Sequence, residues 1–284
     1  MLSKGLGILL VLASLPALAQ TRGTPNAAPP AFLPRRHPPR KVLPGTRPVY
    51  DPVNHVTVSY DINWAGYAVT GSDFTYVGGS WTVTKPDCSK TPNSYSSEWV
   101  GIDGWSSDSV EQIGTDTDCN GKTPFYYVWY EFYPLNTVVI KDVSIAPGDK
   151  FLASVTYNGD DEYTVTIKND TTGKSFSKKV KFKGADGSGV PPRNSAEWIM
   201  EMDSGRPKDL TDFGTDSFGQ YNTGVSGGAD TATDASASGV ISDFGSAVQE
   251  AITTTTGSST TPETAVPSIL APDGSSFTVK WKSE

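Results

Sequence analysis

The chain has 284 residues, with 23 Lys and Arg, 31 Asp and Glu, two His and two Cys. This length fits one large domain or two small ones, and an aromatic content of 11% is too high for a disordered chain. Only His55 lies in the body of the chain, because His37 falls in a Pro/Arg-rich stretch near the N-terminus. A zinc site with two body histidines is therefore excluded, and nothing around His55 suggests a Ser–His–Asp or Cys–His site. Hydrolytic chemistry would depend mainly on carboxylates, amides or hydroxyls.

Residues 1–19 have the pattern of a secretory signal peptide. Lys4 supplies a positive charge, residues 6–18 form an apolar run, and Ala17-Leu18-Ala19 is a small-x-small cleavage sequence. The run is shorter than the roughly 20 apolar residues that a membrane helix needs, and no second apolar stretch follows. We expect a secreted, extracellular protein with no membrane partner; an uncleaved anchor or a buried helix is the alternative.

Residues 20–50 differ sharply in composition from the rest of the chain. They contain six basic residues, many prolines and no acidic residue. Proline fixes φ and removes a backbone donor, so this segment is not expected to join a sheet or a helix. We interpret residues 20–50 as a basic leader or pro-segment, with a flexible linker or wall-binding tail nearly as compatible with the composition.

The body, residues 51–284, is strongly acidic. It holds 16 basic residues and all 31 acidic ones, which gives a net charge near −15. Nucleic acids and anionic membranes bind basic surfaces, so neither is an expected partner, and we expect a monomer. An acidic body suits a protein that works at low pH. We expect the basic leader to dock on the acidic body and to inhibit the protein at neutral pH. Acid or high salt should weaken this docking.

Cys88 and Cys119 are the only cysteines, and in an exported protein they are candidates for a disulfide. Two free buried thiols are the alternative, because spacing alone does not show whether the side chains meet. Asn169-Asp170-Thr171 is an N-glycosylation sequon, which matters only if the host glycosylates.

Period-two alternation predicts an all-β body, an antiparallel β-sandwich with at most one short helix. It is clear at residues 151–157, 163–167, 176–182 and 277–281. Helical spacing occurs only at residues 243–252. Residues 214–266, rich in small and polar residues, are expected to form long surface loops.

Five segments place polar or aromatic side chains where a plain sandwich would place aliphatic ones: residues 63–67, 97–104, 111–116, 125–133 and 194–201. Alternation puts Glu197 and Glu201 on one face of the last segment and the apolar residues Ala196, Trp198, Met200 and Met202 on the other. In 125–133 both faces are aromatic, so one is expected to fill the core and the other to line a groove. Alternation also pairs Trp99 with Asp103 and Gln112 with Asp116. Taken alone, each of these residues is more typical of the core, solvent face or turns of a β-sandwich than of an active site.

Together, the segments resemble the glutamic peptidases, or eqolisins. NWAGY, WVGIDG, Q-x-G-x-D, WYEFYP, NSAEWIME and DFG occur in the family's order from Asn63 toward the last strand. The resemblance implies a curved, concanavalin-like β-sandwich of two antiparallel sheets. It also implies a secreted endopeptidase with polypeptide substrates, active at acid pH, made as a zymogen and using no metal or cofactor.

The resemblance carries over residue by residue. By motif, the catalytic pair is Gln112 and Glu197, and the substrate-binding or supporting residues are Trp64, Trp99, Asp103, Asp116 and Glu131. Glu111 departs from the fungal pattern, which has an apolar residue before the Gln. If Glu111 pointed inward it could raise the pKa of Glu197, but alternation directs it to the opposite face. The loop that holds Cys88 also departs from the pattern, which leaves subsite preference open.

The implied chemistry is physically sound. The Glu197 carboxylate can take a proton from a water that attacks the peptide carbonyl, and then pass that proton to the leaving nitrogen. The Gln112 amide can donate a hydrogen bond to the developing oxyanion, a contribution of about 3–4 kcal/mol in serine proteases. No covalent intermediate is needed.

Two rival functions use the same groove. Concanavalin-like glycosidases place two carboxylates on a concave aromatic face, and Glu131 with Glu197 could be that pair. A non-catalytic groove-binding module is the other rival. Gln112 discriminates between them, because it is essential only for a peptidase.

Overall fold

The computed structural model describes residues 34–184, 189–202, 209–253 and 263–282. The signal-like residues 1–19 lie outside this part of the chain, as does much of the leader. Within the described residues, no helix combines the length and apolarity needed to span a bilayer.

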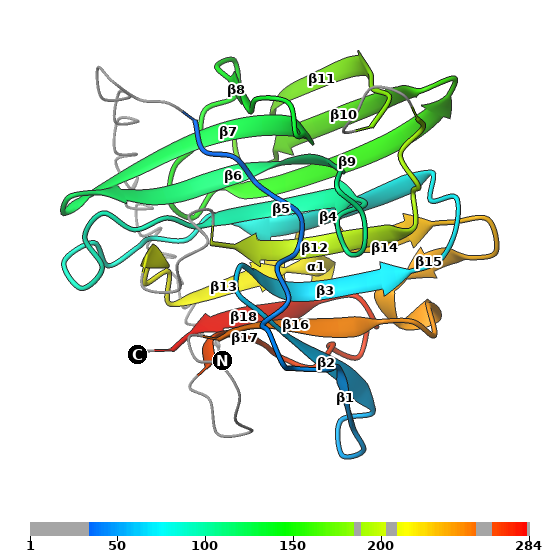
Figure 1. Ribbon diagram of the computed structural model, residues 1–284. Coiled ribbons are helices and arrows are strands. Elements are labelled where there is room, and N and C mark those ends of the chain that lie inside the picture. The colour runs from blue at the N-terminus through cyan, green and yellow to red at the C-terminus, as the bar shows by residue number, and fades with distance from the viewer. Residues whose placement is uncertain (1–33, 185–188, 203–208, 254–262, 283–284) are drawn as a thin grey trace, which may run out of the picture.

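One sheet carries most of the segments singled out above. Its strands are, in spatial order, β8 (Val138–Ile140), β7 (Thr123–Tyr133), β6 (Val110–Asn120), β5 (Ser97–Ile102), β12 (Ser195–Glu201), β3 (Trp64–Thr70), β16 (Val248–Thr253), β2 (Val56–Asp61) and β1 (Val49–Asp51). All neighbours are antiparallel except β16 and β2. We call this the site sheet (Figure 1).

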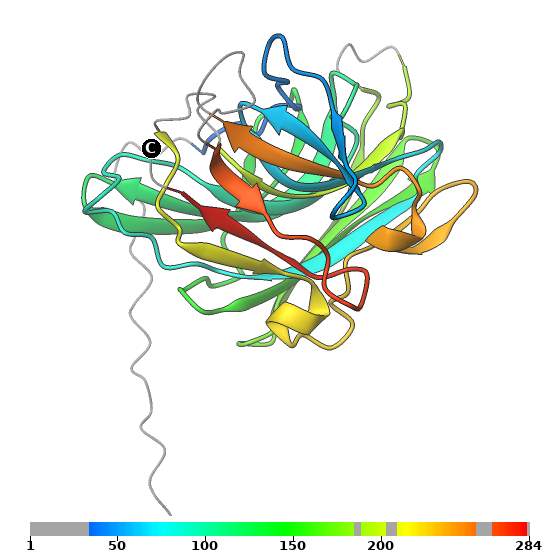
Figure 2. The ribbon, with the colours of Figure 1, turned by 90° about the horizontal axis from the view of Figure 1, so that it is seen from below.

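The second sheet packs behind it. Its order is β11 (Lys174–Lys181), β10 (Glu162–Asn169), β9 (Lys150–Gly159), β4 (Tyr76–Thr82), β13 (Thr215–Phe218), β18 (Phe277–Trp281) and β17 (Glu263–Pro267). A hairpin of β14 (Thr231–Thr233) and β15 (Ser238–Val240) also pairs with β4. Strand β17 pairs with β16, so the two sheets are joined along one side, and both are visibly curved (Figure 2).

The predicted fold class, an all-β sandwich of two antiparallel sheets, is confirmed. The regular helices described are one five-residue helix, α1 (Gly219–Thr223), and one 3-10 turn, Ile241–Asp243. The core lies between the sheets and includes one alternating set from β12, namely Ala196, Trp198 and Met200. The other set, with Ile199, belongs to a separate apolar cluster on the outer face of the site sheet. The alternation therefore assigned these faces correctly.

Three local predictions are wrong. Residues 248–253 form strand β16 rather than a helix, because pairing with β2, β3 and β17 outweighs a helical spacing that β-branched Val248 and Ile252 only weakly favour. Residues 214–266 contain α1 and strands β13 to β17, not only loops. The leader does join a sheet: Val42 makes an isolated bridge to Asp61, and β1 begins at Val49.

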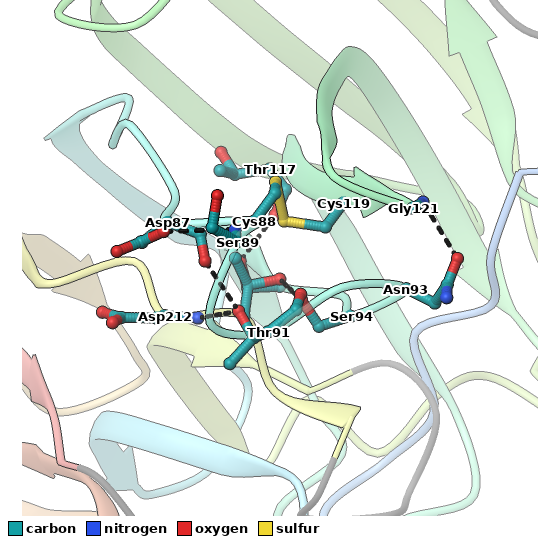
Figure 3. The surroundings of a disulfide bond; sticks show 12 residues. Asp87, Cys88, Ser89, Thr91, Asn93, Ser94, Thr117, Cys119, Gly121 and Asp212 are labelled. Carbon is teal, nitrogen blue, oxygen red and sulfur yellow. Dashed lines mark hydrogen bonds between the residues drawn. A yellow bond between two sulfur atoms is a disulfide. The ribbon is translucent and has the colours of Figure 1, made fainter.

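A disulfide joins Cys88 to Cys119, with 5.4 Å between their Cα atoms (Figure 3). It ties the connection between β4 and β5 to the end of β6. The same connection is held by a hydrogen bond of 2.9 Å from the backbone N–H of Gly121 to Asn93, and by one of 2.8 Å from the N–H of Asp212 to Thr91. The alternative of free thiols does not describe this structure.

Candidate active site

Gln112 and Glu197 lie in one row across the site sheet. Gln112 on β6 is directly opposite Gly101 on β5, and Gly101 is directly opposite Glu197 on β12. Residues opposite one another in an antiparallel pair point to the same face. Two strand spacings put the backbones of Gln112 and Glu197 about 10 Å apart, with their side chains on the outer face.

Gly101 forms the floor between these two side chains. A Cβ built at this position would lie 2.9 Å from the ring of Trp99 and 3.2 Å from Cβ of Gln112. Glycine therefore allows the Trp99 ring and the Gln112 side chain to pack closely over this position, which a larger residue would prevent.

Glu131 extends the same row on the far side of Gln112, since the two are directly opposite on β7 and β6. Three strand spacings, about 14 Å, separate the backbones of Glu131 and Glu197. Gln112 thus lies between Glu131 and Glu197 in the row, and it is the nearer of the two to Glu197.

The predicted tryptophans line the neighbouring rows. Trp64 and Trp99 meet edge to face with ring centroids 5.0 Å apart, and both belong to the outer apolar cluster, as do Tyr127 and Trp129. Nε1 of Trp99 donates a 2.9 Å hydrogen bond to Glu201, which also accepts one of 3.1 Å from Asn63. Glu201 therefore orients the aromatic wall of the site.

Asp103 does not continue the face of Trp99, because strand β5 ends at Ile102 and Asp103 has φ of 72°. Its carboxylate instead accepts backbone N–H bonds from Arg193 at 2.8 Å and Asn194 at 2.9 Å. Asp103 holds the segment that leads into β12. Burial raises its pKa to about 6, although these two bonds act in the opposite direction.

Glu111 is opposite Ile102 in the register, so it lies on the core face, as alternation predicted. Burial, together with nearby Asp103, raises its pKa well above the usual range. Glu111 therefore lies behind the sheet and is not a second carboxylate in the groove.

Glu197 is fully buried, and neither carboxyl oxygen has a hydrogen-bond partner of normal geometry among the described residues. Burial raises its pKa well above the usual range, and the charge of Asp103 adds to the effect. The Ser195 hydroxyl and the positive charge of Arg40 act in the opposite direction. With the leader in place, the surroundings of Glu197 therefore favour its neutral form.

The leader runs across the outer face of the site sheet. Figure 1 shows it in blue, passing over β7, β6, β5, β12 and β3 before it enters β1. Nε2 of Gln112 donates a 2.7 Å hydrogen bond to the carbonyl oxygen of His37. The candidate catalytic amide therefore holds a peptide carbonyl of the same chain.

His37 is fully buried between two carboxylates. Its Nδ1 lies 3.1 Å from Glu131 and its Nε2 lies 3.2 Å from Asp116. Its backbone N–H donates a 2.8 Å bond to the same oxygen of Glu131. The imidazole is stacked on Trp129, with centroids 3.5 Å apart and an interplanar angle of 4°.

Basic residues on either side of His37 are also bound. The guanidinium of Arg35 lies over the ring of Tyr95 at 3.0 Å, and that of Arg40 lies over Trp105 at 3.4 Å. Arg40 also lies 3.5 Å from Glu250 and 3.9 Å from Asp61. The basic leader and the acidic body thus meet inside the groove.

Further on, the Lys41 backbone N–H donates a 2.7 Å bond to Asn63, and the Ile62 N–H donates a 2.8 Å bond to the Lys41 carbonyl. These two bonds hold Lys41 against residues 62 and 63, which come directly before β3.

The structure thus gathers Gln112, Glu197, Trp64, Trp99, Asp116 and Glu131 along one groove, whereas Asp103 binds the segment before β12 instead. Sequence reasoning missed His37, because a lone histidine among prolines shows no local pattern. It also missed the role of Trp129, although that residue shares the groove-facing side of 125–133 with Glu131.

The fold and this site define a curved two-sheet β-sandwich with an amide–carboxyl pair on its outer face. Residues 62–264 match the Peptidase A4 family, which is well over half of the chain. The chain therefore belongs to the Peptidase A4 family, and its resemblance to the glutamic peptidases is confirmed.

Individual relatives agree with this assignment. Scytalidopepsin B of Scytalidium lignicola is 34% identical over 150 residues, which are 52% of this chain and 55% of that protein. The alignment thus spans about half the length of that relative. The fold is similar to the crystal structure of scytalido-glutamic peptidase with a transition state analog inhibitor (22% identity, TM-score 0.61) and to the structure of SCP-B, a member of the eqolisin family, in a complex with the tripeptide Ala-Ile-His (23%, 0.57). Each comparison covers 78% of this chain and 98% of the other.

Proposed function

We propose that this protein is a secreted endopeptidase that acts at acid pH and hydrolyses peptide bonds with Gln112 and Glu197. The observation that carries the proposal is the His37 carbonyl held by the Gln112 amide, in a row that also contains Glu197. A peptide of the chain itself already lies where a substrate would lie. Family membership supports the same activity.

The groove accounts for the chemistry. Once Glu197 is ionised, it can take a proton from a water molecule, which then attacks the carbonyl held by Gln112. The Gln112 N–H is aimed at the oxygen that becomes negative in the transition state, so its bond strengthens as charge develops. Glu197 then returns the proton to the leaving nitrogen. Trp64, Trp99 and Glu201 keep the surrounding wall rigid.

We propose that the leader makes the full chain a zymogen by occupying this groove. Residues 35–41 cover the sheet, and hydrogen bonds from Gln112 to His37 and from Lys41 to Asn63 hold them there. The bond after the His37 carbonyl leads into Pro38, whose ring replaces the amide hydrogen of a normal leaving group. The leader therefore binds like a substrate but is a poor one.

Acid should release the leader. The pairs of His37 with Asp116 and Glu131 help to hold it in the groove, and carboxylate pairs of folded proteins are in general lost in strong acid. Because both pairs are buried, salt should screen them less than it screens surface pairs. We therefore expect acid to be a stronger activator than high salt at neutral pH.

Digestion of denatured casein between about pH 2 and 7 tests the activity. The full chain is incubated in acid first, and pepstatin and EDTA serve as controls. We expect cleavage that depends on acid and ignores both inhibitors. The Glu197→Gln and Gln112→Ala chains should each lose nearly all activity, at least 100-fold, and keep the wild-type circular dichroism spectrum.

Full activity in either variant would disprove the catalytic assignment. A wild-type chain that cleaves nothing at any pH, even after its leader is removed, would point to the groove as a polysaccharide site instead.

A further inference from the structure

Glu111 is a buried carboxyl group that the proposed mechanism leaves without a role. It is directly opposite Ile102, the last residue of β5, and Asp103 is the next residue along the chain. The side chains of Glu111 and Asp103 are fully shielded from solvent and form a hydrogen bond with each other. This pair lies one residue away from the row of Gln112 and Glu197, behind the sheet that carries them.

The contact between these two carboxyl groups needs a proton, because a carboxylate has no hydrogen to donate. Both oxygens of Asp103 are already acceptors, for the backbone N–H groups of Arg193 at 2.8 Å and Asn194 at 2.9 Å. In the part of the chain that the structure describes, neither oxygen of Glu111 accepts a bond of normal geometry. Because bound N–H donors favour the ionised form, Asp103 is the better anion and Glu111 is the better donor.

Asp103 fixes the segment that leads into β12. Besides the two bonds that its carboxylate accepts, its own backbone N–H donates a 3.0 Å bond to the carbonyl of Ser195. Glu197 is the third residue of β12. A displacement of Asp103 would therefore shift the start of this strand, and Glu197 with it.

The groups around the carboxyl pair do not include a cation bonded to Glu111. They are Ser109, Phe132 on β7, Tyr163 on β10, Glu197 on β12 and Arg193 before β12. The guanidinium of Arg193 lies over Tyr157 at 4.1 Å and 2.6 Å from Asp73, and no ion pair joins it to Glu111 among the described residues. If Glu111 lost its proton, two adjacent buried carboxylates would repel each other with no counterion between them.

We propose that Glu111 is a positioning residue: the proton that it donates to Asp103 keeps Glu197 in place, and loss of this proton ends activity as the pH rises. The inference rests on the proposed function, because it takes Glu197 as the base. A glutamate base alone would work better at higher pH, where more of it is ionised. Activity confined to acid therefore needs a second group that must keep its proton, and Glu111 is that group.

The first test compares pH profiles. Glu111→Gln keeps the size of the side chain and supplies an N–H donor to Asp103 at every pH. The full chain, incubated in acid first, is assayed on a quenched peptide between about pH 3 and 7. We expect kcat of the variant at about pH 4 to stay within twofold of wild type, and the upper limb of its profile to move up by about one pH unit or more.

Asp108→Asn is the matched control, because Asp108 is an exposed acid in the connection before β6, and it should leave the profile unchanged. Circular dichroism at the assay temperature checks that each chain stays folded across the range. An upper limb that is the same in Glu111→Gln and wild type would overturn the inference.

The second test removes the donor. Glu111→Leu has a side chain of similar length but no N–H or O–H group. We expect kcat at about pH 4 to fall about tenfold with KM changed less than about twofold, because the outer face that binds the peptide is intact. If this variant does not fold, the profile of Glu111→Gln decides alone. A kcat equal to that of wild type would show that Asp103 does not need the donor.

The third test measures the shared proton without catalysis, in the full chain carrying Glu197→Gln. A proton held on Glu111 stabilises the fold below the unfolded-state pKa near 4, and this stability is lost as the pH rises through the folded-state value. Adding Glu111→Gln should therefore reduce the fall in melting temperature between about pH 4 and 8, whereas adding Asp108→Asn should not. An equal fall with and without Glu111→Gln would show that Glu111 holds no such proton.

The outcomes separate the two proposals. If no peptide is cut in a Glu197-dependent way at any pH, the endopeptidase proposal fails, while the melting series still decides whether Glu111 and Asp103 share a proton. If peptides are cut but the upper limb does not respond to Glu111→Gln, the positioning inference alone is overturned.

Discussion

At the scale of single residues, the site depends on a glycine, Gly101, which has no side chain. Gly101 separates Gln112 from Glu197, and any larger residue there would project into the space above the row. Its role is steric, so it could be recognised only after strands β6, β5 and β12 were placed side by side.

Gly101→Ala should therefore damage activity more than stability. The added methyl group meets the Trp99 ring at 2.9 Å, which we expect to cost about 1–3 kcal/mol of unfolding free energy and at least tenfold in kcat/KM. Peptide hydrolysis and thermal melting check this. Gly245→Ala is the control, since no atom lies within 4 Å of its added Cβ. Unchanged kcat/KM in Gly101→Ala would show that the row is not where the peptide lies.

Pro38 and Pro39 should decide whether the leader is an inhibitor or a substrate. Replacing both with alanine restores a normal amide hydrogen on the leaving nitrogen and frees φ at both positions. We expect the double variant to cut itself between residues 37 and 38 in acid, with mass spectrometry finding a new N-terminus at residue 38. The same change in a Glu197→Gln chain should produce no cut. Cleavage elsewhere only would contradict the placement of the His37 carbonyl.

At the scale of elements, the connection between β4 and β5 forms one end of the groove. It carries Tyr95, on which Arg35 lies, and it is attached to β6 through Cys88 and Cys119 (Figure 3). The disulfide therefore holds a leader-binding residue in place as well as closing a loop.

Replacing both cysteines with serine should lower the unfolding free energy by about 3–4 kcal/mol, the loop-entropy value for a sequence separation of 31. It should also increase trypsin cleavage after Arg35, because Tyr95 is then held less firmly. Urea denaturation measures the first effect, and the wild-type chain treated with reductant is the comparison. Equal stability of the oxidised and serine forms would contradict the prediction.

At the scale of the whole molecule, buried carboxyl groups link stability to acid. Glu98 on β5 and Asp216 on β13 face each other between the two sheets, and burial together with their mutual repulsion raises the pKa of Glu98 well above its usual range. Burial also raises the pKa of Asp216 and Asp230 strongly, and that of Asp61 to about 8. At a pH between its unfolded-state and its folded-state pKa, each of these groups binds a proton in the folded chain that it would release in the unfolded chain.

A carboxyl group with a raised folded-state pKa stabilises the fold below its unfolded pKa near 4, and this stabilisation is lost as pH rises through the folded-state value. Each such proton lowers the unfolding free energy by about 1.4 kcal/mol per pH unit in that window. We expect Glu197→Gln protein to melt highest near pH 4 and progressively lower toward pH 8. Asp87 and Glu162, which are partly exposed, have lowered pKa values, so the stability that they add is lost only as the pH falls below about 4.

Asp216→Asn should flatten this profile. The variant removes one proton uptake site and supplies an amide that can donate to Glu98, so it should gain stability relative to wild type above about pH 6. Differential scanning calorimetry across the range checks both profiles. A melting temperature that rises from pH 4 to 8 in the wild-type chain would contradict the account.

The sequence by itself determined the two-sheet class, the inward and outward faces of 194–201, and the family order of motifs that singles out Gln112 and Glu197. These depend on local alternation, which the backbone of an extended strand imposes on every second residue. Only the tertiary structure placed Gly101 between that pair, made 248–253 a strand and brought His37 between Asp116 and Glu131 and onto Trp129. Each of these arises from contacts between residues 11 to 180 positions apart, whose pairing no local propensity encodes.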